Sequence, residues 1–194
     1  MPRIIVLAHQ KGGVGKTTLA LNIALVIREA GASVSLVDTD PQGSLTRLKD
    51  VLTLTVHPAL KAADLRSLPD QYVIVDTPPY LSEHLPGLFE AADIVLIPTK
   101  AGYMDAAAIR ATVQMTRKHA KAARIVLSMV KPNTSLTEEV RAILEAYSVP
   151  ILDTTIYDRV AYTRSPDTER LSDPKAEAEI LNLTEEVINI LNNG

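Results

Sequence analysis

Short apolar stretches alternate along the chain with longer stretches in which apolar residues recur every three or four positions. The short stretches predict β-strands at 3–8, 33–38, 72–76, 93–98, 124–130 and 150–153. Several are continuous runs of Val, Ile and Leu, a pattern typical of parallel strands that are covered on both faces. The longer stretches predict helices at 16–30, 104–122, 136–147 and 175–192. Between 41 and 70 the pattern indicates only a connector, a short strand and a helical turn.

The alternation of these strands and helices predicts the architecture. It favours an α/β fold with a doubly wound, mostly parallel sheet and helices on both faces, whose ligands bind at the carboxyl ends of the strands. Gly31 would end the first helix, and Thr134 or Ser135 would cap the third ahead of two glutamates. The sequence has no evident repeat or linker, so we expect a single domain over 1–194.

Composition narrows the class of protein. The chain has 46% hydrophobic and 22% charged residues and a net charge of −3, so contact with nucleic acid would need a local basic patch. It contains no cysteine, which excludes disulfides, thiolate metal sites and cysteine-held iron–sulfur clusters. No run approaches the ~18 apolar residues of a membrane span, and the N-terminus is already strand-like rather than a signal peptide. We therefore expect a cytoplasmic protein.

A glycine-rich loop joins the first predicted strand to the first predicted helix. We take all its residues as candidate nucleotide contacts: Lys11, Gly12, Gly13, Val14, Gly15, Lys16, Thr17 and Thr18. The glycines let backbone N–H groups turn toward phosphate oxygens at a helix N-terminus. Lys16 can reach the β- and γ-phosphates, and the Thr17 hydroxyl can ligate Mg²⁺. The alternative, a turn that only packs tightly, explains neither the lysine nor the paired threonines.

Carboxylates end two further predicted strands. Asp38 and Asp40 follow one apolar run, and Asp76 follows the next. Because Asp38 and Asp40 flank a single residue, both side chains of an extended chain would point to the same side. Carboxylates at the mouth of a parallel sheet can hold Mg²⁺ or orient a water. The alternative is turn formation by the Asp-Pro-Gln-Gly sequence.

Three of these motifs together resemble the ParA/MinD family of deviant Walker ATPases, and within it the short ParA-type partition ATPases. They are the loop at 11–18, the Asp-x-Asp-Pro-Gln-Gly sequence at 38–43 and the Val-Asp-Thr-Pro-Pro sequence at 75–79. The loop departs from the general phosphate-loop pattern, because Gln10 stands where that pattern has glycine and Lys11 adds a second lysine. Similarity in the second half of the chain extends the resemblance over essentially its full length.

The resemblance implies an ATPase that uses ATP and Mg²⁺ and forms an ATP-dependent sandwich homodimer. Lys11 would reach the partner's phosphates while Lys16 acts within its own subunit. Gly12 would lie where the two loops approach closely, with no room for a Cβ. Catalysis would then depend on Lys11, Lys16 and Asp40.

The resemblance also implies the positions of the metal, the attacking water and the base. Thr17, Asp38 and Asp76 would surround Mg²⁺, and Asp40 would position or activate the water. The base would contact the loop after 124–130, with Lys131 and Pro132 as candidates, and the segment around 156–158.

Short ParA-like ATPases coat nonspecific DNA in the ATP state, and a ParB-like adaptor on the cargo stimulates hydrolysis and release. The resemblance therefore implies a protein that associates with the nucleoid in the ATP state and does not associate with a membrane. On the predicted helix Arg110, Arg117 and Lys121 form one stripe that could contact phosphates. An ordinary solvated face explains the stripe equally well. Arg164, Arg170 and Lys175 are alternative contacts, although acidic neighbours dilute their charge.

Two other classes of protein stay open. A MinD-like membrane-associated positioning ATPase would need a basic amphipathic tail, whereas this C-terminus is acidic and has no aromatic residue near its end. A small-molecule ATP-dependent enzyme of the same superfamily would need its own catalytic set, which is not evident here. An electron carrier of the nitrogenase-reductase type is excluded because it needs cysteines.

Overall fold

The computed structural model describes residues 1–120, 122–132 and 136–193. Its centre is a six-stranded parallel sheet with the order β3-β2-β4-β1-β5-β6. The strands are β1 (Arg3–Leu7), β2 (Val34–Asp38), β3 (Thr55–His57), β4 (Tyr72–Asp76), β5 (Ile94–Thr99) and β6 (Ala123–Leu127). The predicted α/β class with a mostly parallel sheet is confirmed.

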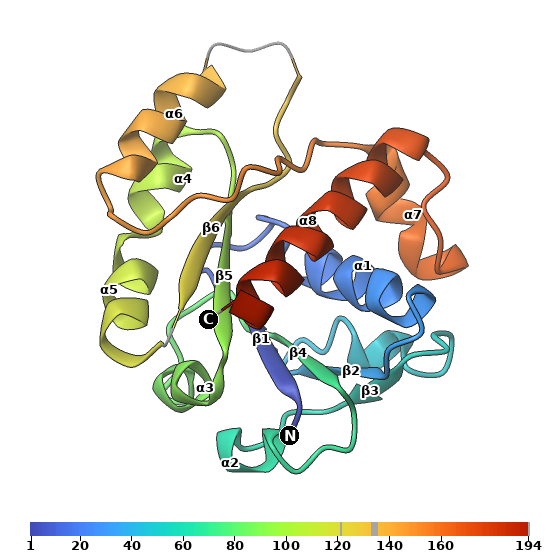
Figure 1. Ribbon diagram of the computed structural model, residues 1–194. Coiled ribbons are helices and arrows are strands. Elements are labelled where there is room, and N and C mark those ends of the chain that lie inside the picture. The colour runs from blue at the N-terminus through green and yellow to red at the C-terminus, as the bar shows by residue number, and fades with distance from the viewer. Residues whose placement is uncertain (121, 133–135, 194) are drawn as a thin grey trace.

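The helices cover both faces of the sheet (Figure 1). One face carries α1 (Lys16–Glu29), α7 (Val160–Thr168) and α8 (Pro174–Asn193). The other carries α2 (Ala62–Leu65), α3 (Leu85–Ala91), α4 (Tyr103–Ala108), α5 (Arg110–His119) and α6 (Leu136–Glu145). A 3-10 turn at Thr46–Leu48 lies between β2 and β3.

Alternate residues of β1, β2, β4, β5 and β6 enter opposite cores, which explains the continuous apolar runs. In β1, Ile5 and Leu7 pack with α1 and α8, whereas Ile4 and Val6 face the opposite set of helices. All four of these β1 side chains are fully buried. The strand therefore packs closely on both faces just before the loop that follows its carboxyl end.

Several predicted elements differ in the structure. The predicted helix 104–122 is two helices separated at Ile109, because α4 packs against α6 while α5 packs against α3. The predicted strand 150–153 is reduced to one parallel bridge between Ile151 and Ile125. Gly31, at φ +84°, ends α1 as expected. The proposed caps Thr134 and Ser135 lie outside the described residues.

Candidate nucleotide site

The glycine-rich loop lies between β1 and α1 at the carboxyl edge of the sheet. Gly13 and Gly15 have φ values of +69° and +92°, which L side chains rarely adopt. Gly15 is the N-cap of α1, so the first N–H groups of the helix are free to face an anion. The Ser128 hydroxyl donates to the Val14 carbonyl at 2.6 Å and ties the loop to the end of β6. The loop is thus shaped and anchored without a ligand.

Lys16 places its ammonium beneath this loop. The residue is 7% exposed, and its Nζ donates to the Lys11 carbonyl at 3.3 Å. Burial lowers the pKa of Lys16, while Asp76 and Asp40 act in the opposite direction. Among the described residues it makes no ion pair. A largely buried ammonium beside the glycine-rich loop and the start of α1 suits phosphate oxygens.

Asp76, at the carboxyl end of β4, has one bonded and one orphaned oxygen. Its Oδ2 accepts a hydrogen bond from the Thr17 hydroxyl at 2.5 Å. Its Oδ1 is buried and has no hydrogen-bond partner within the described ranges. Burial, helped by the neighbouring Asp38 and Asp40, raises the pKa of Asp76 to about 7 against the opposing effects of Thr17 and Lys16. An orphaned buried carboxylate oxygen beside a hydroxyl fits a divalent cation.

The chain itself supplies few ligands for such a cation. No cluster of three or more histidine, aspartate or glutamate side chains that could hold a metal occurs in the described part of the chain. Thr17 and Asp76 would therefore contribute a hydroxyl and a carboxylate, and phosphate oxygens and water would complete the shell. This division is the usual one for Mg²⁺ bound with a nucleotide.

Asp38 and Asp40 both make turn contacts. The Oδ2 of Asp38 accepts from the backbone N–H and the hydroxyl of Thr46 at 2.8 and 3.0 Å, and its Oδ1 accepts from the Asp40 N–H at 3.1 Å. The Oδ1 of Asp40 accepts from the Gln42 N–H at 2.9 Å. The turn alternative is therefore realised in the structure. A metal role for Asp38 and a water-positioning role for Asp40 stay predictions.

Lys11 is directed quite differently from Lys16. Its side chain is 46% exposed, and its Nζ pairs with the Asp105 carboxylate of α4 at 2.6 Å. Next to it, a Cβ added at Gly12 would meet only the Cβ of Pro79, at an ordinary 3.8 Å. The folded chain alone therefore gives no steric reason for glycine at position 12.

A cavity beside the loop is lined by the start of α1, the end of β6 and the segment that leads into α7. Its walls are Gly15, Thr18, Leu19, Ser128, Met129, Ile156, Tyr157, Asp158, Arg159, Tyr162 and Thr163. Segment 156–158 was expected near the base, whereas Arg159 and Tyr162 were missed as wall residues. Lys131 and Pro132 are exposed and are not among the lining residues, so their contact with a nucleotide stays a prediction.

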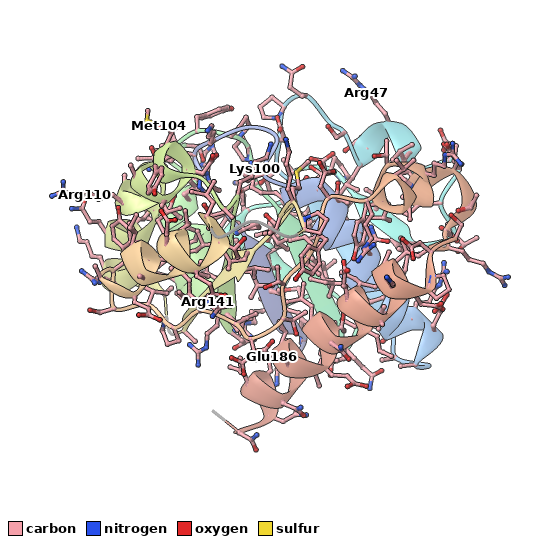
Figure 2. All side chains as sticks on the ribbon, turned by 90° about the horizontal axis from the view of Figure 1, so that it is seen from above. Arg47, Lys100, Met104, Arg110, Arg141 and Glu186 are labelled. Carbon is pink, nitrogen blue, oxygen red and sulfur yellow. The ribbon has the colours of Figure 1, made fainter. Side chains whose placement is uncertain are left out.

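The predicted basic stripe is only partly described. Arg110 and Arg117 lie seven residues apart on α5 and both are exposed. Figure 2 shows Arg110 reaching outward from the edge of the molecule. The Arg117 guanidinium donates to the Tyr147 carbonyl. Lys121 lies outside the described residues, and α5, which carries the other two, ends at His119.

Comparison with known proteins decides the family. The model of the CobQ/CobB/MinD/ParA nucleotide binding domain matches residues 5–172. The chain belongs to this family. It is 30% identical to the maintenance of carboxysome distribution protein A of Halothiobacillus neapolitanus, over 81% of each chain. It is also 30% identical to the chromosome-partitioning ATPase Soj of Thermus thermophilus, over 75% of this chain and 76% of Soj.

Solved structures of the family share the fold. The McdA–ATP complex from Cyanothece superposes with a TM-score of 0.76 at 18% identity and covers 96% of each chain. MinD from Pyrococcus horikoshii with Mg-ADP superposes with a TM-score of 0.73 at 18% identity, again over 96% of each chain.

The ParA/MinD resemblance and the predicted ATPase activity are thus confirmed. Two of the solved structures with this fold are complexes with ATP and with Mg-ADP. Among the described residues, no helix combines the length and the apolar character that crossing a bilayer requires.

Proposed function

We propose that this ParA/MinD-family ATPase is a dimerisation switch that positions or segregates a cargo, either plasmid or chromosomal DNA or a protein assembly. In the ATP state two copies close around their nucleotides and bind nonspecific DNA. A ParB-like adaptor on the cargo stimulates hydrolysis and release. The names of the similar proteins, which concern carboxysome distribution and chromosome partitioning, support this range of cargoes.

The contrast between the two loop lysines carries the proposal. Lys16 is buried under its own loop, whereas the Lys11 side chain is half-exposed and forms an ion pair with Asp105 at the surface. One chain therefore offers one ammonium to its own phosphates and a second to a neighbouring molecule. Gly12, which the isolated chain does not require, lies beside Lys11 where a second loop would approach.

Within each subunit, three groups of residues would bind different parts of the nucleotide and its Mg²⁺. The loop N–H groups and Lys16 would hold the phosphates, Thr17 and Asp76 would hold Mg²⁺, and the cavity lined by Tyr157 would take the base. Bound Mg²⁺ neutralises charge on the phosphate oxygens. Asp40 would orient the attacking water from the loop after β2, and Asp38 would support the metal's outer shell through its turn.

The test is ATP hydrolysis measured against protein concentration, with and without duplex DNA and the product of the neighbouring gene. A dimerisation switch gives a turnover per molecule that rises with concentration and is stimulated by DNA with the adaptor. A turnover independent of concentration and of both additions would refute the proposal. The oligomeric state with a nonhydrolysable ATP analogue gives an independent check, because the switch predicts a dimer.

One observation weighs against the MinD-like alternative. The apolar face of α8 is buried against α1, with Ala176, Ile180, Leu183, Val187 and Leu191 all in that core. The described C-terminal helix therefore has no free apolar face to lie on a membrane. A small-molecule enzyme of the superfamily would instead show turnover that depends on an organic co-substrate and not on DNA.

A further inference from the structure

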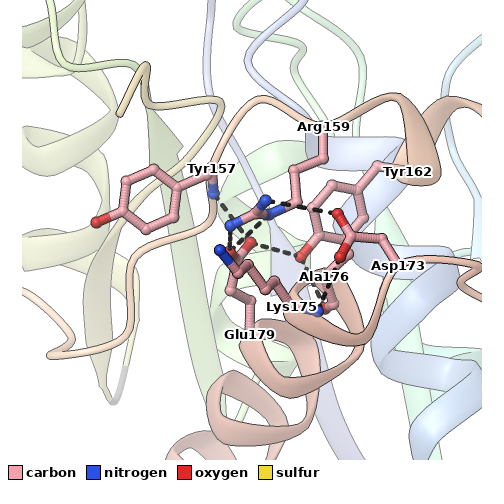
Figure 3. Close-up of polar contacts among 7 residues, drawn as sticks. All are labelled: Tyr157, Arg159, Tyr162, Asp173, Lys175, Ala176 and Glu179. Atoms are coloured by element: carbon pink, nitrogen blue, oxygen red, sulfur yellow. Dashed lines mark hydrogen bonds and ion pairs between the residues drawn. The ribbon is translucent and has the colours of Figure 1, made fainter. Parts of the chain in front are cut away.

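One carboxylate on α8 joins three residues that line the base-side cavity (Figure 3). The Oε2 of Glu179 accepts hydrogen bonds from the Tyr157 N–H at 3.1 Å and from the Tyr162 hydroxyl at 3.0 Å. Its Oε1 accepts from the Arg159 guanidinium, through Nε at 2.7 Å and through NH2 at 2.6 Å. The Glu179 side chain is 12% exposed, so these bonds are largely shielded from water.

Backbone hydrogen bonds also hold this segment to the sheet. The Ile156 N–H donates to the Leu127 carbonyl and the Asp158 N–H to the Val130 carbonyl, each at 2.9 Å. The Tyr162 hydroxyl also lies 3.0 Å from the Ala176 carbonyl, so it shares its proton between that oxygen and Glu179. The Arg159 guanidinium also reaches Asp173 at 3.4 Å and lies 5.6 Å from the centre of the Tyr157 ring, so the two wall residues stack on one another. Glu179 adds the contact that joins the backbone at Tyr157 to the side chains of Arg159 and Tyr162.

The helix that carries Glu179 is fixed to the helix that carries the phosphate site. On the side facing α1, Ala176 and Ile180 flank Glu179 in sequence and are buried in the core shared with Leu19 and Ile23. The helix α1 begins at Lys16 of the phosphate site, and α8 carries Glu179. Because α1 and α8 pack against each other, the phosphate site and the base-side wall are both attached to this pair of helices.

We propose that Glu179 is a positioning residue for the nucleoside: it holds the wall formed by Tyr157, Arg159 and Tyr162 at a fixed distance from the phosphate loop. This inference rests on the proposed placement of the base in that cavity. It predicts that loss of the Glu179 carboxylate weakens binding of the nucleoside part of ATP and leaves binding of the phosphates intact. Glu179 itself need not touch the nucleotide.

The chain provides a matched control seven residues further along α8. The Glu186 carboxylate also accepts two hydrogen bonds, from the Asp153 and Thr154 N–H groups at 2.8 and 3.1 Å. It therefore fastens the same connecting segment to the same helix, but these two residues do not line the cavity. Glu186→Gln removes a similar structural contact without touching the wall.

The experiment compares the Kd for ATP and for inorganic tripolyphosphate, each with Mg²⁺, by calorimetric titration of the full chain. Tripolyphosphate probes the phosphate site alone. We expect Glu179→Gln to raise the Kd for ATP about tenfold, as the loss of charge-assisted hydrogen bonds implies, with no change for tripolyphosphate. Glu186→Gln should change neither Kd. If Glu179→Gln does not fold, Tyr162→Phe, which keeps the ring and removes the hydroxyl, should still raise the Kd for ATP alone.

Three results would overturn the inference: an unchanged Kd for ATP in Glu179→Gln, equal weakening of both ligands, or the same loss in Glu186→Gln. Failure of the proposed base site looks different. In that case the wild-type protein itself would bind tripolyphosphate and ATP equally well, and the inference would fall with it.

Discussion

Replacing Asp76 with asparagine should stabilise the nucleotide-free protein at neutral pH, although it removes a residue assigned to Mg²⁺. The reason is that the fold buries this carboxylate completely and that its Oδ1 has no hydrogen-bond partner within the described part of the chain. Asparagine has the same shape, carries no charge and can still accept the hydrogen bond that Thr17 donates. The substitution therefore removes the cost of a buried charge while it keeps the packing.

The size of the effect follows from the pKa of Asp76, which folding raises from 3.8 to about 7. Because the folded state binds this proton more tightly, the cost of ionisation grows as the pH rises through this range and is complete above it. At about 1.4 kcal/mol per pKa unit, it amounts to about 4 kcal/mol at pH 7.5 and under about 2 kcal/mol at pH 5.

The new amide NH₂ replaces the orphaned oxygen and lacks an acceptor, which costs about 1–3 kcal/mol. A net gain of about 2 kcal/mol at pH 7.5 remains, or about 4–8 °C in Tm for a chain of this size.

The assay is thermal unfolding followed by circular dichroism, without nucleotide and with EDTA, at pH 7.5 and at pH 5. Asp38→Asn is the matched control, because Asp38 is also buried but both of its oxygens accept hydrogen bonds. That variant should be less stable than the wild type. The reasoning is refuted if Asp76→Asn is no more stable than the wild type at pH 7.5, or if its gain is the same at pH 5.

Four further predictions test other parts of the site. Lys11→Ala should still bind nucleotide, measured by equilibrium binding, but should lose nearly all turnover, measured by phosphate release. An undiminished rate of phosphate release would exclude the cross-subunit role. Asp40→Ala should form stable ATP-dependent dimers by light scattering while hydrolysis stops, and rapid turnover by that variant would contradict it. Glutamate at both Arg110 and Arg117 should weaken ATP-dependent DNA binding at least tenfold in a gel-shift titration, and unchanged affinity would place the DNA surface elsewhere. Burial lowers the pKa of His9 to about 4, so the contribution of His9 to the free energy of unfolding should fall as the pH drops from about 6.5 to 4. In urea titrations His9→Asn should remove this loss of stability in acid, and a pH profile identical to that of the wild type would contradict the prediction.

The sequence predicted the elements that carry a strong local signal. The apolar runs that became β1 and β5 are buried on both faces, so packing and pattern agree at every position. The glycine-rich loop between β1 and α1 was equally visible, because the positive φ values at Gly13 and Gly15 favour glycine. Both features depend on residues adjacent in the chain.

Features set by contacts between distant segments could not be predicted in the same way. No glycine or proline marks the break at Ile109, which arises because α4 and α5 pack against different helices. The helix α7 was missed because Pro166 lies inside it, a residue that usually argues against a helix interior. The ion pair between Lys11 and Asp105 joins residues 94 positions apart, and nothing local to either one indicates it.

Several unsatisfied polar groups lie around the glycine-rich loop. Within the described residues, Asp76 has a buried oxygen and His9 a buried Nε2 without a hydrogen-bond partner, and Lys16 is a buried ammonium without an ion pair. Nearby, Tyr103 and Met104 of α4 expose 54% and 78% of their surface, next to the residue that pairs with Lys11. An exposed ion pair such as Lys11–Asp105 contributes only about 0–1 kcal/mol, so it does not hold Lys11 against a phosphate. Unsatisfied or weakly held polar groups that gather at one loop are expected where a ligand and a partner complete the structure.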